Sequence, residues 1–390
     1  MASAQPSADK MGHNNALLEV YSHIEYPFTL TRGEGVYVWD SEGQKYIDFY
    51  GGHCVCSLGH SPEVVVSAIH EQSKQLLFYS NLAPLAVKVR GAERLISFAS
   101  NAFTKAFFCN SGAEANENAL KIAVKKTGRP KLVAFKGGFH GRTLLAMTAT
   151  HNQKWHEQYH HWVGSCVHLT PNALEEIVAV DEETAAVILE PIQSIGGCTE
   201  FAADFLAALR RRCDEVGAML IFDEVQTGIG RTGSPFVSGH FGAQPDMMTL
   251  AKGLAGGFPI GAVAMTDAVA QTIAPGDIAA TFGAGPLAMA AMIATLDEIE
   301  QRGLARHAVA MEQSIRAKLT LPEVTRVAGR GLLLGVELDR EAKPVQQQLF
   351  KNGIIVGTNA NPKMIHLLPP LTIGEAEVDA LREGLIEVLR

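Results

Sequence analysis

The stretch from Asp204 to Asp223, DFLAALRRRCDEVGAMLIFD, decides the fold. Up to Val216 its apolar residues recur at the spacing of one helix face. After Gly217 the run Met219–Phe222 is continuously apolar and ends on an acid. A continuous apolar run of this kind is typical of a strand that is buried on both faces. A one-sided helix leading into such a strand therefore predicts a parallel sheet covered by helices.

The same alternation of short apolar runs and helical segments continues on both sides of this stretch. The runs expected to form the other strands of the sheet are Ala106–Cys109, Lys131–Phe135, Ala185–Leu189, Met247–Leu250 and Gly261–Met265. These runs predict an α/β protein whose large domain contains a mostly parallel sheet.

The C-terminal quarter of the chain has a different pattern, which predicts a smaller α+β domain. The elements expected there are strands at Leu332–Leu338, Ile354–Gly357 and Met364–Leu367 and helices at Ala342–Lys351 and Glu375–Leu389. Near the other end, Gly35–Phe49 has the pattern of a hairpin. We expect this hairpin to add to the smaller domain.

Composition and charge exclude several classes of protein. The chain has 390 residues, and its 33 Lys and Arg against 41 Asp and Glu give a formal net charge of −8. An acidic chain disfavours a nucleic-acid partner, because binding phosphates requires clustered basic residues. Six scattered cysteines without zinc-ligand spacing predict no metal site. A polar N-terminal segment without an apolar signal core predicts a cytoplasmic location.

One uncharged stretch, Ile278–Leu296, is long enough to be considered as a membrane span. Gly283, Gly285 and Pro286 interrupt it, and its second half consists mainly of alanine and methionine. This composition argues against a span and predicts no membrane association. We expect the stretch to pack in the core and at a subunit interface, which agrees with the low share of charged residues.

A helix start that could bind an anion follows the expected strand Ala106–Cys109. The residues Asn110 to Glu114 lead into a helical segment, and free N–H groups at a helix start attract anions. The same residues also fit a capping box, in which Ser111 and Glu114 stabilise only the helix end. On these residues alone the two interpretations are equally supported.

Two charged side chains stand directly after buried strands. Asp223 follows Met219–Phe222, and Lys252 follows the strand that begins at Met247. Ligands of an open parallel sheet bind beyond the carboxyl ends of its strands. A buried lysine has a lowered pKa and can act as an amine nucleophile. Together the two residues form the pair that pyridoxal phosphate requires, a Schiff-base lysine and an acid for the pyridine nitrogen.

Two glycine-rich segments follow strands of the expected sheet. Gly137–Thr143, GGFHGRT, contains Phe139, which could stack on a flat ring, and Arg142, which could bind a carboxylate through two parallel hydrogen bonds. Thr227–Gly233, TGIGRTG, lacks the Lys-Ser ending of a P-loop and the helix of a dinucleotide-binding fingerprint. We interpret this second segment as a mobile active-site loop.

With these positions established, the chain resembles the class III aminotransferases of pyridoxal-phosphate fold type I, most closely the acetylornithine and succinylornithine aminotransferases. The resemblance covers nearly all of the chain, and its motifs occur in family order. They are NSGAEANENALKIA (110–123), FHGRT (139–143), ILEPIQ (188–193), IFDEVQTGIGRTG (221–233), LAKGL (250–254), ATFG (280–283) and LLPPLTI (367–373). The resemblance implies a seven-stranded sheet, pyridoxal 5′-phosphate as cofactor and a homodimer with active sites at its interface.

The resemblance also implies roles for residues around the cofactor ring. Lys252 would bind the cofactor covalently and move the proton during the reaction, and Asp223 would keep the pyridine nitrogen protonated. Gln226 would donate a hydrogen bond to the phenolic oxygen. Val225 and Phe139 would pack on the two faces of the ring.

The same resemblance implies how the cofactor phosphate is held. Ser111, Gly112 and Ala113 would bind it at the helix start, and Thr281 would reach it from the partner subunit. Glu190 would support the site from the substrate side.

Substrate recognition is where this chain departs from the family pattern. The arginine of the FHGRT motif, here Arg142, binds a substrate carboxylate. Members that use glutamate usually have a second arginine just before the PPL segment, and many have a glutamate after EPIQ. Here those positions are His366 and Ile195. Histidine offers no fixed bidentate fork, so we expect glutamate to bind more weakly than in such members.

The function implied is transfer of the terminal amino group of an N-acylated ornithine, or of a similar ω-amino acid, to a 2-oxo acid such as 2-oxoglutarate by a ping-pong mechanism. Such a reaction belongs to amino-acid biosynthesis, for example of arginine. Alternatives with the same fold are an ω-amine transaminase or an aminomutase, which needs no external acceptor, and more remotely a non-catalytic cofactor-binding protein. The expected domain boundaries are 1–50 for the arm and hairpin, 51–285 for the large domain and 286–390 for the small domain.

Overall fold

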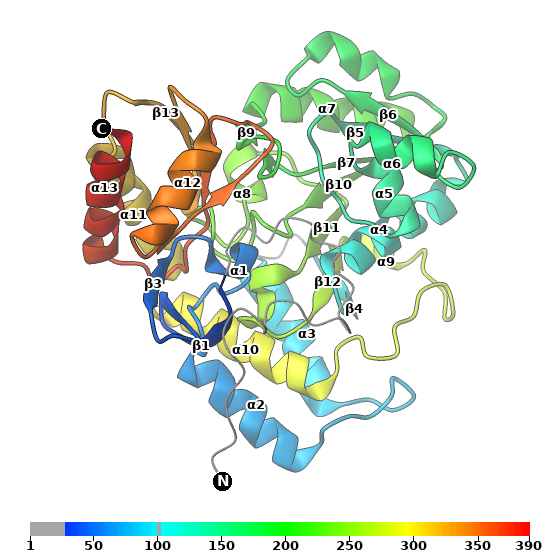
Figure 1. Ribbon diagram of the computed structural model, residues 1–390. Coiled ribbons are helices and arrows are strands. Elements are labelled where there is room, and N and C mark those ends of the chain that lie inside the picture. Colours follow the sequence, from blue (N-terminus) through cyan, green and yellow to red (C-terminus); the bar gives the residue numbers. More distant parts are fainter. Residues whose placement is uncertain (1–27, 100–102) are drawn as a thin grey trace.

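The computed structural model describes residues 28–99 and 103–390, and its centre is a seven-stranded sheet (Figure 1). The strand order is β4-β12-β11-β10-β7-β5-β6. In that order the strands are Lys105–Cys109, Gly261–Met265, Met247–Leu250, Met219–Asp223, Thr184–Leu189, Lys131–Phe135 and Ser165–Leu169. Only β12 runs antiparallel to its neighbours within this sheet. The expected α/β fold with a mostly parallel sheet is confirmed.

Helices cover both faces of the sheet because consecutive residues of its strands point to opposite sides. Ile221 of β10 packs in the same core cluster as the apolar face of α4 (Gly112–Thr127). Its neighbours Leu220 and Phe222 pack instead with α7 (Ala203–Val216). The continuous apolar run of β10 is therefore explained by burial from two sides.

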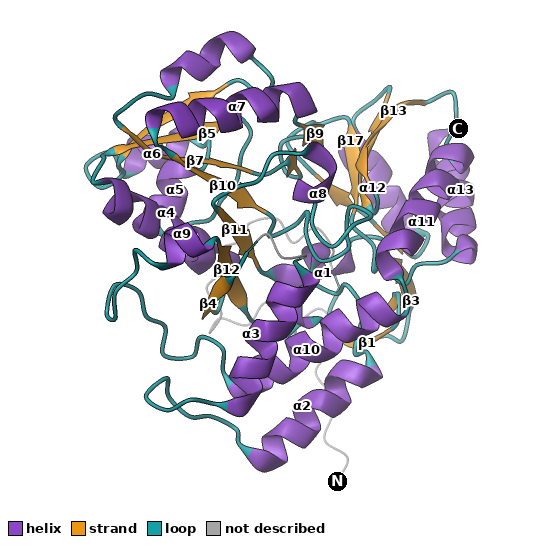
Figure 2. Ribbon diagram, turned by 180° about the vertical axis from the view of Figure 1, so that it is seen from behind, coloured by secondary structure: helices purple, strands orange, loops and turns teal. Residues whose placement is uncertain are grey.

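The C-terminal part contains a second sheet, seen beside its three helices in Figure 2. Its strand order is β13-β14-β17-β16. These strands are Val324–Arg330, Leu333–Leu338, Met364–Leu367 and Gly357–Thr358, and the helices are α11 (Leu304–Lys318), α12 (Ala342–Lys351) and α13 (Glu375–Leu389).

The N-terminal hairpin joins this part through a third sheet of order β1-β2-β3-β15. Its strands are Leu30–Glu34, Tyr37–Asp40, Lys45–Asp48 and Ile354–Ile355. Ile354 and Ile355 pair in parallel with Ile47 and Asp48. The hairpin thus pairs with a strand of the C-terminal part, and its assignment to a smaller domain stays a prediction.

The uncharged stretch 278–296 supplies most of α10 (Pro286–Gln301), with Pro286 at the first turn. This helix packs against α2 (Glu63–Gln75) and α3 (Ala86–Phe98), and also against α11. Among the described residues, no helix has both the length and the apolar character needed to cross a membrane. The stretch is thus a core helix that connects the N-terminal and C-terminal parts, and the proposed domain boundary at 285 stays a prediction.

The remaining short elements connect these layers around the large sheet. They are α1 (Gly51–Cys54), α5 (Leu144–Ala149), α6 (Gln153–Gln158), η2 (Leu174–Ala179), β8 (Ile192–Gln193), β9 (Thr199–Glu200), α8 (Ser238–Phe241), η3 (Lys252–Ala255) and α9 (Asp267–Ala270).

The segment Thr227–Gly233 corrects one expectation, because it is a buried joint rather than a mobile loop. Thr227, Arg231 and Thr232 are each at most 2% exposed. The Arg231 guanidinium donates to the backbone oxygen of Leu332 at 3.1 Å and to that of Pro369. The glycines and the arginine of this motif therefore connect the sheet to the C-terminal part.

We predict that replacing Arg231 weakens this joint. Arg231→Met keeps much of the side-chain volume but leaves two buried carbonyl groups without donors, which lowers the free energy of unfolding by about 2–4 kcal/mol. Arg326→Met is the matched control, because Arg326 is 59% exposed and pairs with Glu337; its loss costs at most about 1 kcal/mol. Urea unfolding measures both, and equal losses in the two variants would contradict the role of Arg231.

Candidate active site

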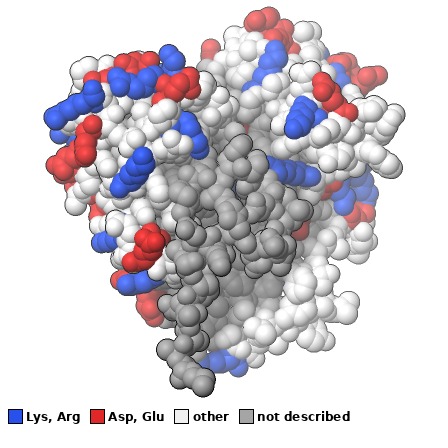
Figure 3. Space-filling view, viewed as in Figure 1, with Lys and Arg blue, Asp and Glu red and all other residues white. Residues whose placement is uncertain are grey.

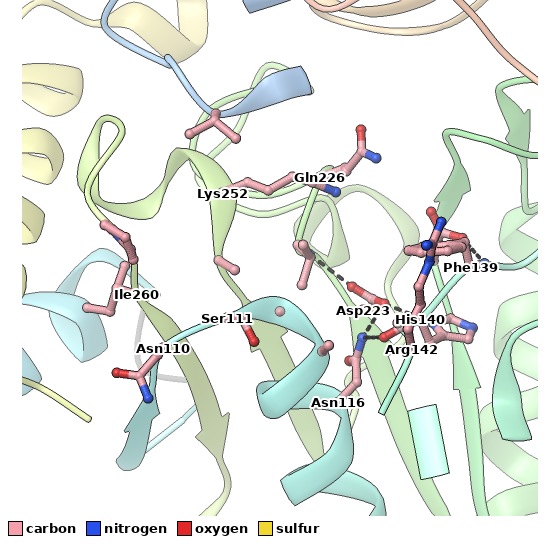
Figure 4. A pocket seen from close by; sticks show the side chains of 18 of the residues that line it. Asn110, Ser111, Asn116, Phe139, His140, Arg142, Asp223, Gln226, Lys252 and Ile260 are labelled. Carbon is pink, nitrogen blue, oxygen red and sulfur yellow. Dashed lines mark hydrogen bonds and ion pairs between the residues drawn. The ribbon is translucent and has the colours of Figure 1, made fainter. Parts of the chain in front are cut away.

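A cavity of about 510 Å³ lies at the carboxyl ends of the central strands (Figure 4). It is lined by ten of the residues selected from the sequence, namely Ser111, Gly112, Ala113, Phe139, Arg142, Glu190, Asp223, Val225, Gln226 and Lys252. His366 and Thr281 do not belong to its lining. The fold therefore brings together at one edge of the sheet residues that are up to 141 positions apart in the sequence, from Ser111 to Lys252.

Asp223 is a buried carboxylate that is held on several sides. Its Oδ2 atom accepts from Asn116 Nδ2 at 2.7 Å and pairs with His140 Nδ1 at 2.8 Å, and its Oδ1 atom accepts from the Val225 amide at 3.0 Å. Asn116 is fixed in turn, because Thr249 Oγ1 donates to its Oδ1 at 2.6 Å. A charge that is only 3% exposed requires such partners, and the network sets its orientation at the end of β10.

Lys252 lies at the start of η3, with its side chain extending toward Gln226 in Figure 4. Its φ of 45° is unusual for a residue with a Cβ and indicates local backbone strain, which concentrates at functional sites. Desolvation lowers the pKa of the amine, and the nearby Cys54, Asp223 and Glu190 oppose this shift. The lowered pKa favours the neutral amine that a nucleophile requires.

The start of α4 can bind an anion. Ser111 Oγ accepts from the Glu114 amide at 3.2 Å, and the Ser111 carbonyl accepts from the Ala115 amide at 3.0 Å. These bonds leave the amides of Gly112 and Ala113 unpaired within the described part of the chain, and both residues line the cavity. Ser111 therefore caps the helix, and two amides remain for a ligand, so anion binding at this helix start stays a prediction.

Another part of the lining carries an aromatic ring, a buried acid and an exposed guanidinium. The Phe139 amide donates to Glu190 Oε1 at 2.8 Å. The Arg142 guanidinium lies 4.9 Å from the centre of the Trp155 ring, an arrangement typical of a cation–π contact. Within residues 28–99 and 103–390 Arg142 forms no ion pair with a carboxylate, so its charge can pair with a ligand.

The comparisons agree with this geometry. The family model for class III aminotransferases matches residues 20–389. This chain belongs to the class III aminotransferase family. It is 41% identical over 387 residues to the acetylornithine aminotransferase of Caldanaerobacter subterraneus subsp. tengcongensis, covering 96% of this chain and 97% of that one. It is 39% identical to the Bacillus subtilis acetylornithine aminotransferase, covering 93% and 95%.

Solved structures give the same family. The ornithine aminotransferase of Toxoplasma gondii superposes with a TM-score of 0.88 at 27% identity, covering 96% of this chain and 92% of that one. A transaminase from the marine bacterium Virgibacillus superposes with a TM-score of 0.90 at 25% identity, covering 96% of both. Another structure of the Toxoplasma enzyme is described with pyridoxal phosphate in its active site. Pyridoxal 5′-phosphate is the cofactor of this class III aminotransferase, and the fold is fold type I.

The residues of the cavity fit this cofactor. The amine, the clamped carboxylate and the unpaired helix amides are the groups needed for an aldehyde, a pyridine nitrogen and a phosphate. Gly112 is also required sterically, because a Cβ there would lie 2.9 Å from Val225 Cγ1 at the cavity wall. The described lining therefore has a complementary group for each end of the cofactor.

Sequence reasoning missed the residues that position the catalytic groups. Asn116, His140 and Thr249 orient Asp223, yet no role was assigned to any of them from the sequence, although Asn116 and His140 lie within the motifs at 110–123 and 139–143. Their only signal is a polar residue at a position that the helical or strand periodicity makes buried. Asn116 and Thr249 satisfy that test, since they are 1% and 0% exposed.

Glu190 gives a test of the electrostatics of the cavity. Desolvation raises its pKa from 4.5 to about 7, despite the nearby His140 and the Phe139 amide. Its contribution to stability is thus full below about pH 4.5 and is lost as the pH rises through 7. We predict that Glu190→Gln becomes progressively more stable relative to wild type between pH 5 and pH 8, measured by thermal unfolding. A difference that does not change with pH would contradict this assignment.

Proposed function

We propose that this enzyme transfers the terminal amino group of an N-acylated ornithine, or of a similar ω-amino acid, to a 2-oxo acid such as 2-oxoglutarate. The supporting observation is the joint presence of Lys252, clamped Asp223 and the open start of α4 in one cavity. The acyl-ornithine substrate is supported by the curated relatives, since those at about 40% identity over nearly the full chain are acetylornithine aminotransferases. A cytoplasmic location is part of this proposal.

The residues divide the chemistry as follows. When bound, the cofactor supplies an electron-withdrawing ring that makes the substrate C–H bond beside the nitrogen acidic. Lys252 would hold the cofactor through its amine and then, as a free amine, would take the proton from that carbon and deliver it to the aldehyde-derived carbon of the cofactor. Asp223 holds the proton on the pyridine nitrogen. Val225 and Phe139 enclose the ring, and Gln226 donates to the phenolic oxygen.

The two ends of the cavity bind anions. The amides of Gly112 and Ala113, with Ser111, hold the cofactor phosphate at the positive end of α4. Arg142 binds a substrate carboxylate through its planar fork. Glu190 holds the loop that carries Phe139 and Arg142, because its carboxylate accepts a hydrogen bond from the Phe139 amide.

A homodimer is also part of the proposal, and it rests on exposed apolar side chains. Leu77, Leu82 and Phe282 are 63%, 92% and 64% exposed. The Phe78 and Phe282 rings lie 5.0 Å apart, which joins the segment after α2 to the segment around Thr281. In Figure 3 the lower right of the face carries few charged side chains. Apolar patches of this kind mark interfaces. In the proposed dimer, Thr281 of one subunit would lie at this interface and reach the cavity of the partner subunit.

We predict that Lys252→Ala abolishes turnover while the protein still binds cofactor. Without the amine, no side chain moves the proton, and the rate of the half-reaction with N-acetylornithine falls more than about 10³-fold. The absorbance of the lysine-bound cofactor disappears at the same time. Lys126→Ala is the control, because within the described residues the Lys126 amine hydrogen-bonds only to the Ala268 carbonyl. Transamination by Lys252→Ala at the normal rate would refute the proposed mechanism.

Arg142 gives a prediction for substrate binding. Arg142→Lys removes the planar fork and raises the KM for N-acetylornithine about 10- to 100-fold. The control substrate is the acylated diamine of the same length without the carboxylate, whose KM stays unchanged. Steady-state kinetics with both substrates measure this difference. An equal rise in both KM values would show that Arg142 does not bind the carboxylate.

A further inference from the structure

His366 lies behind the wall of the cavity rather than in it. It belongs to β17, where its backbone pairs with Gly335 of β14 on one side and Gly357 of β16 on the other. His366 is only 1% exposed. Two neighbouring strands therefore fix the position of the imidazole, and the ring has little freedom to reach a substrate.

The ring contacts Ser194, which in turn contacts Gln226. His366 Nε2 lies 3.1 Å from Ser194 Oγ, and Ser194 Oγ donates to Gln226 Oε1 at 2.9 Å. Ser194 is fully buried in the turn between β8 and β9, and Gln226 is 6% exposed and lines the cavity. The three side chains form a continuous hydrogen-bond chain from β17 to the cavity wall.

The directions of these bonds follow from counting protons. The Ser194 hydroxyl has one proton, which it donates to Gln226, so its oxygen accepts from His366 Nε2–H. Burial lowers the pKa of His366 to about 3, and the nearby His53, Lys252 and Arg231 act in the same direction. The imidazole is therefore neutral at physiological pH and carries a single N–H. The hydrogen bond to Ser194 places this proton on Nε2.

We propose that Ser194 and His366 are positioning residues that hold the Gln226 amide with its NH2 group toward the cavity. The inference rests on the proposed function, because it assigns the NH2 group to the phenolic oxygen of the cofactor. A primary amide can rotate and present either its oxygen or its nitrogen. With Gln226 Oε1 bound to Ser194, only the nitrogen is left to face the cavity.

The first test measures the pH at which the absorbance of the bound cofactor changes. A donor to the phenolic oxygen stabilises its anionic form and lowers this midpoint. Gln226→Ala, Ser194→Ala and His366→Leu in the holoenzyme each raise the midpoint, by about 0.5 to 1 pH unit for the two positioning residues. His366→Gln restores it, because its amide can donate to Ser194. Thr295→Val is the control, since it removes a buried hydroxyl that only donates to the Ala291 carbonyl.

The second test is whether the effects depend on Gln226. If the hydrogen-bond chain acts through the Gln226 amide, Ser194→Ala does not change the absorbance midpoint of a protein that already carries Gln226→Ala. Likewise, His366→Leu does not change the midpoint of a protein that already carries Ser194→Ala. The kcat of Gln226→Ala, of Ser194→Ala and of His366→Leu each falls about 5- to 10-fold, while the KM of the amino donor stays constant.

The outcomes separate the two proposals. If Gln226→Ala shifts the midpoint but Ser194→Ala and His366→Leu do not, the positioning role is wrong and the proposed function stands. The positioning role is also wrong if the midpoint shifts of the single variants add up in the double variants. If Gln226→Ala itself leaves the midpoint unchanged, the proposed contact of Gln226 with the cofactor is wrong.

Discussion

The active site depends on keeping one carboxylate charged inside the protein. Asp223 is buried at the end of the central strand β10, where a carboxylate without hydrogen-bond partners would be unfavourable. Asn116 of α4, His140 of the loop after β5 and the Val225 amide compensate for the lost water. These partners come from different elements, so the sheet order and the packing of α4 must both be correct before the carboxylate takes this orientation.

Much of this arrangement follows from local sequence. A run such as Met219–Phe222 is apolar on both sides, so it must be a central strand, and a polar residue directly after it must emerge at the carboxyl end of the sheet. That argument located Asp223 and Lys252 without knowledge of their neighbours. By contrast, β6 (Ser165–Leu169) is an edge strand that contains polar residues, and its pattern gave no comparable signal.

The rest depends on contacts between distant residues that no local pattern encodes. Asn116 and Asp223 are 107 positions apart, and Ser194 and His366 are 172 apart. Periodicity can predict that such a residue is buried, but its partner is decided by topology. The segment Thr227–Gly233 illustrates the same limit, because its glycines suggested mobility while Arg231 binds carbonyls that lie about a hundred or more residues later.

The side-chain amides of Asn116 and Gln226 are oriented in the same way, by a hydroxyl group that donates to the amide oxygen. Thr249 donates to Asn116 Oδ1, which leaves its NH2 group for Asp223, and Ser194 donates to Gln226 Oε1, which leaves that NH2 group for the cavity. In the second case the terminal member is a neutral histidine, and an Nε2–H used toward Ser194 is not available to bind an anion. Arg142 is the only guanidinium among the described residues that line the cavity, so we expect a substrate to gain little from a second carboxylate. The hydrogen-bond chain at His366 thus gives a physical reason for the expected weak binding of glutamate, which stays a prediction.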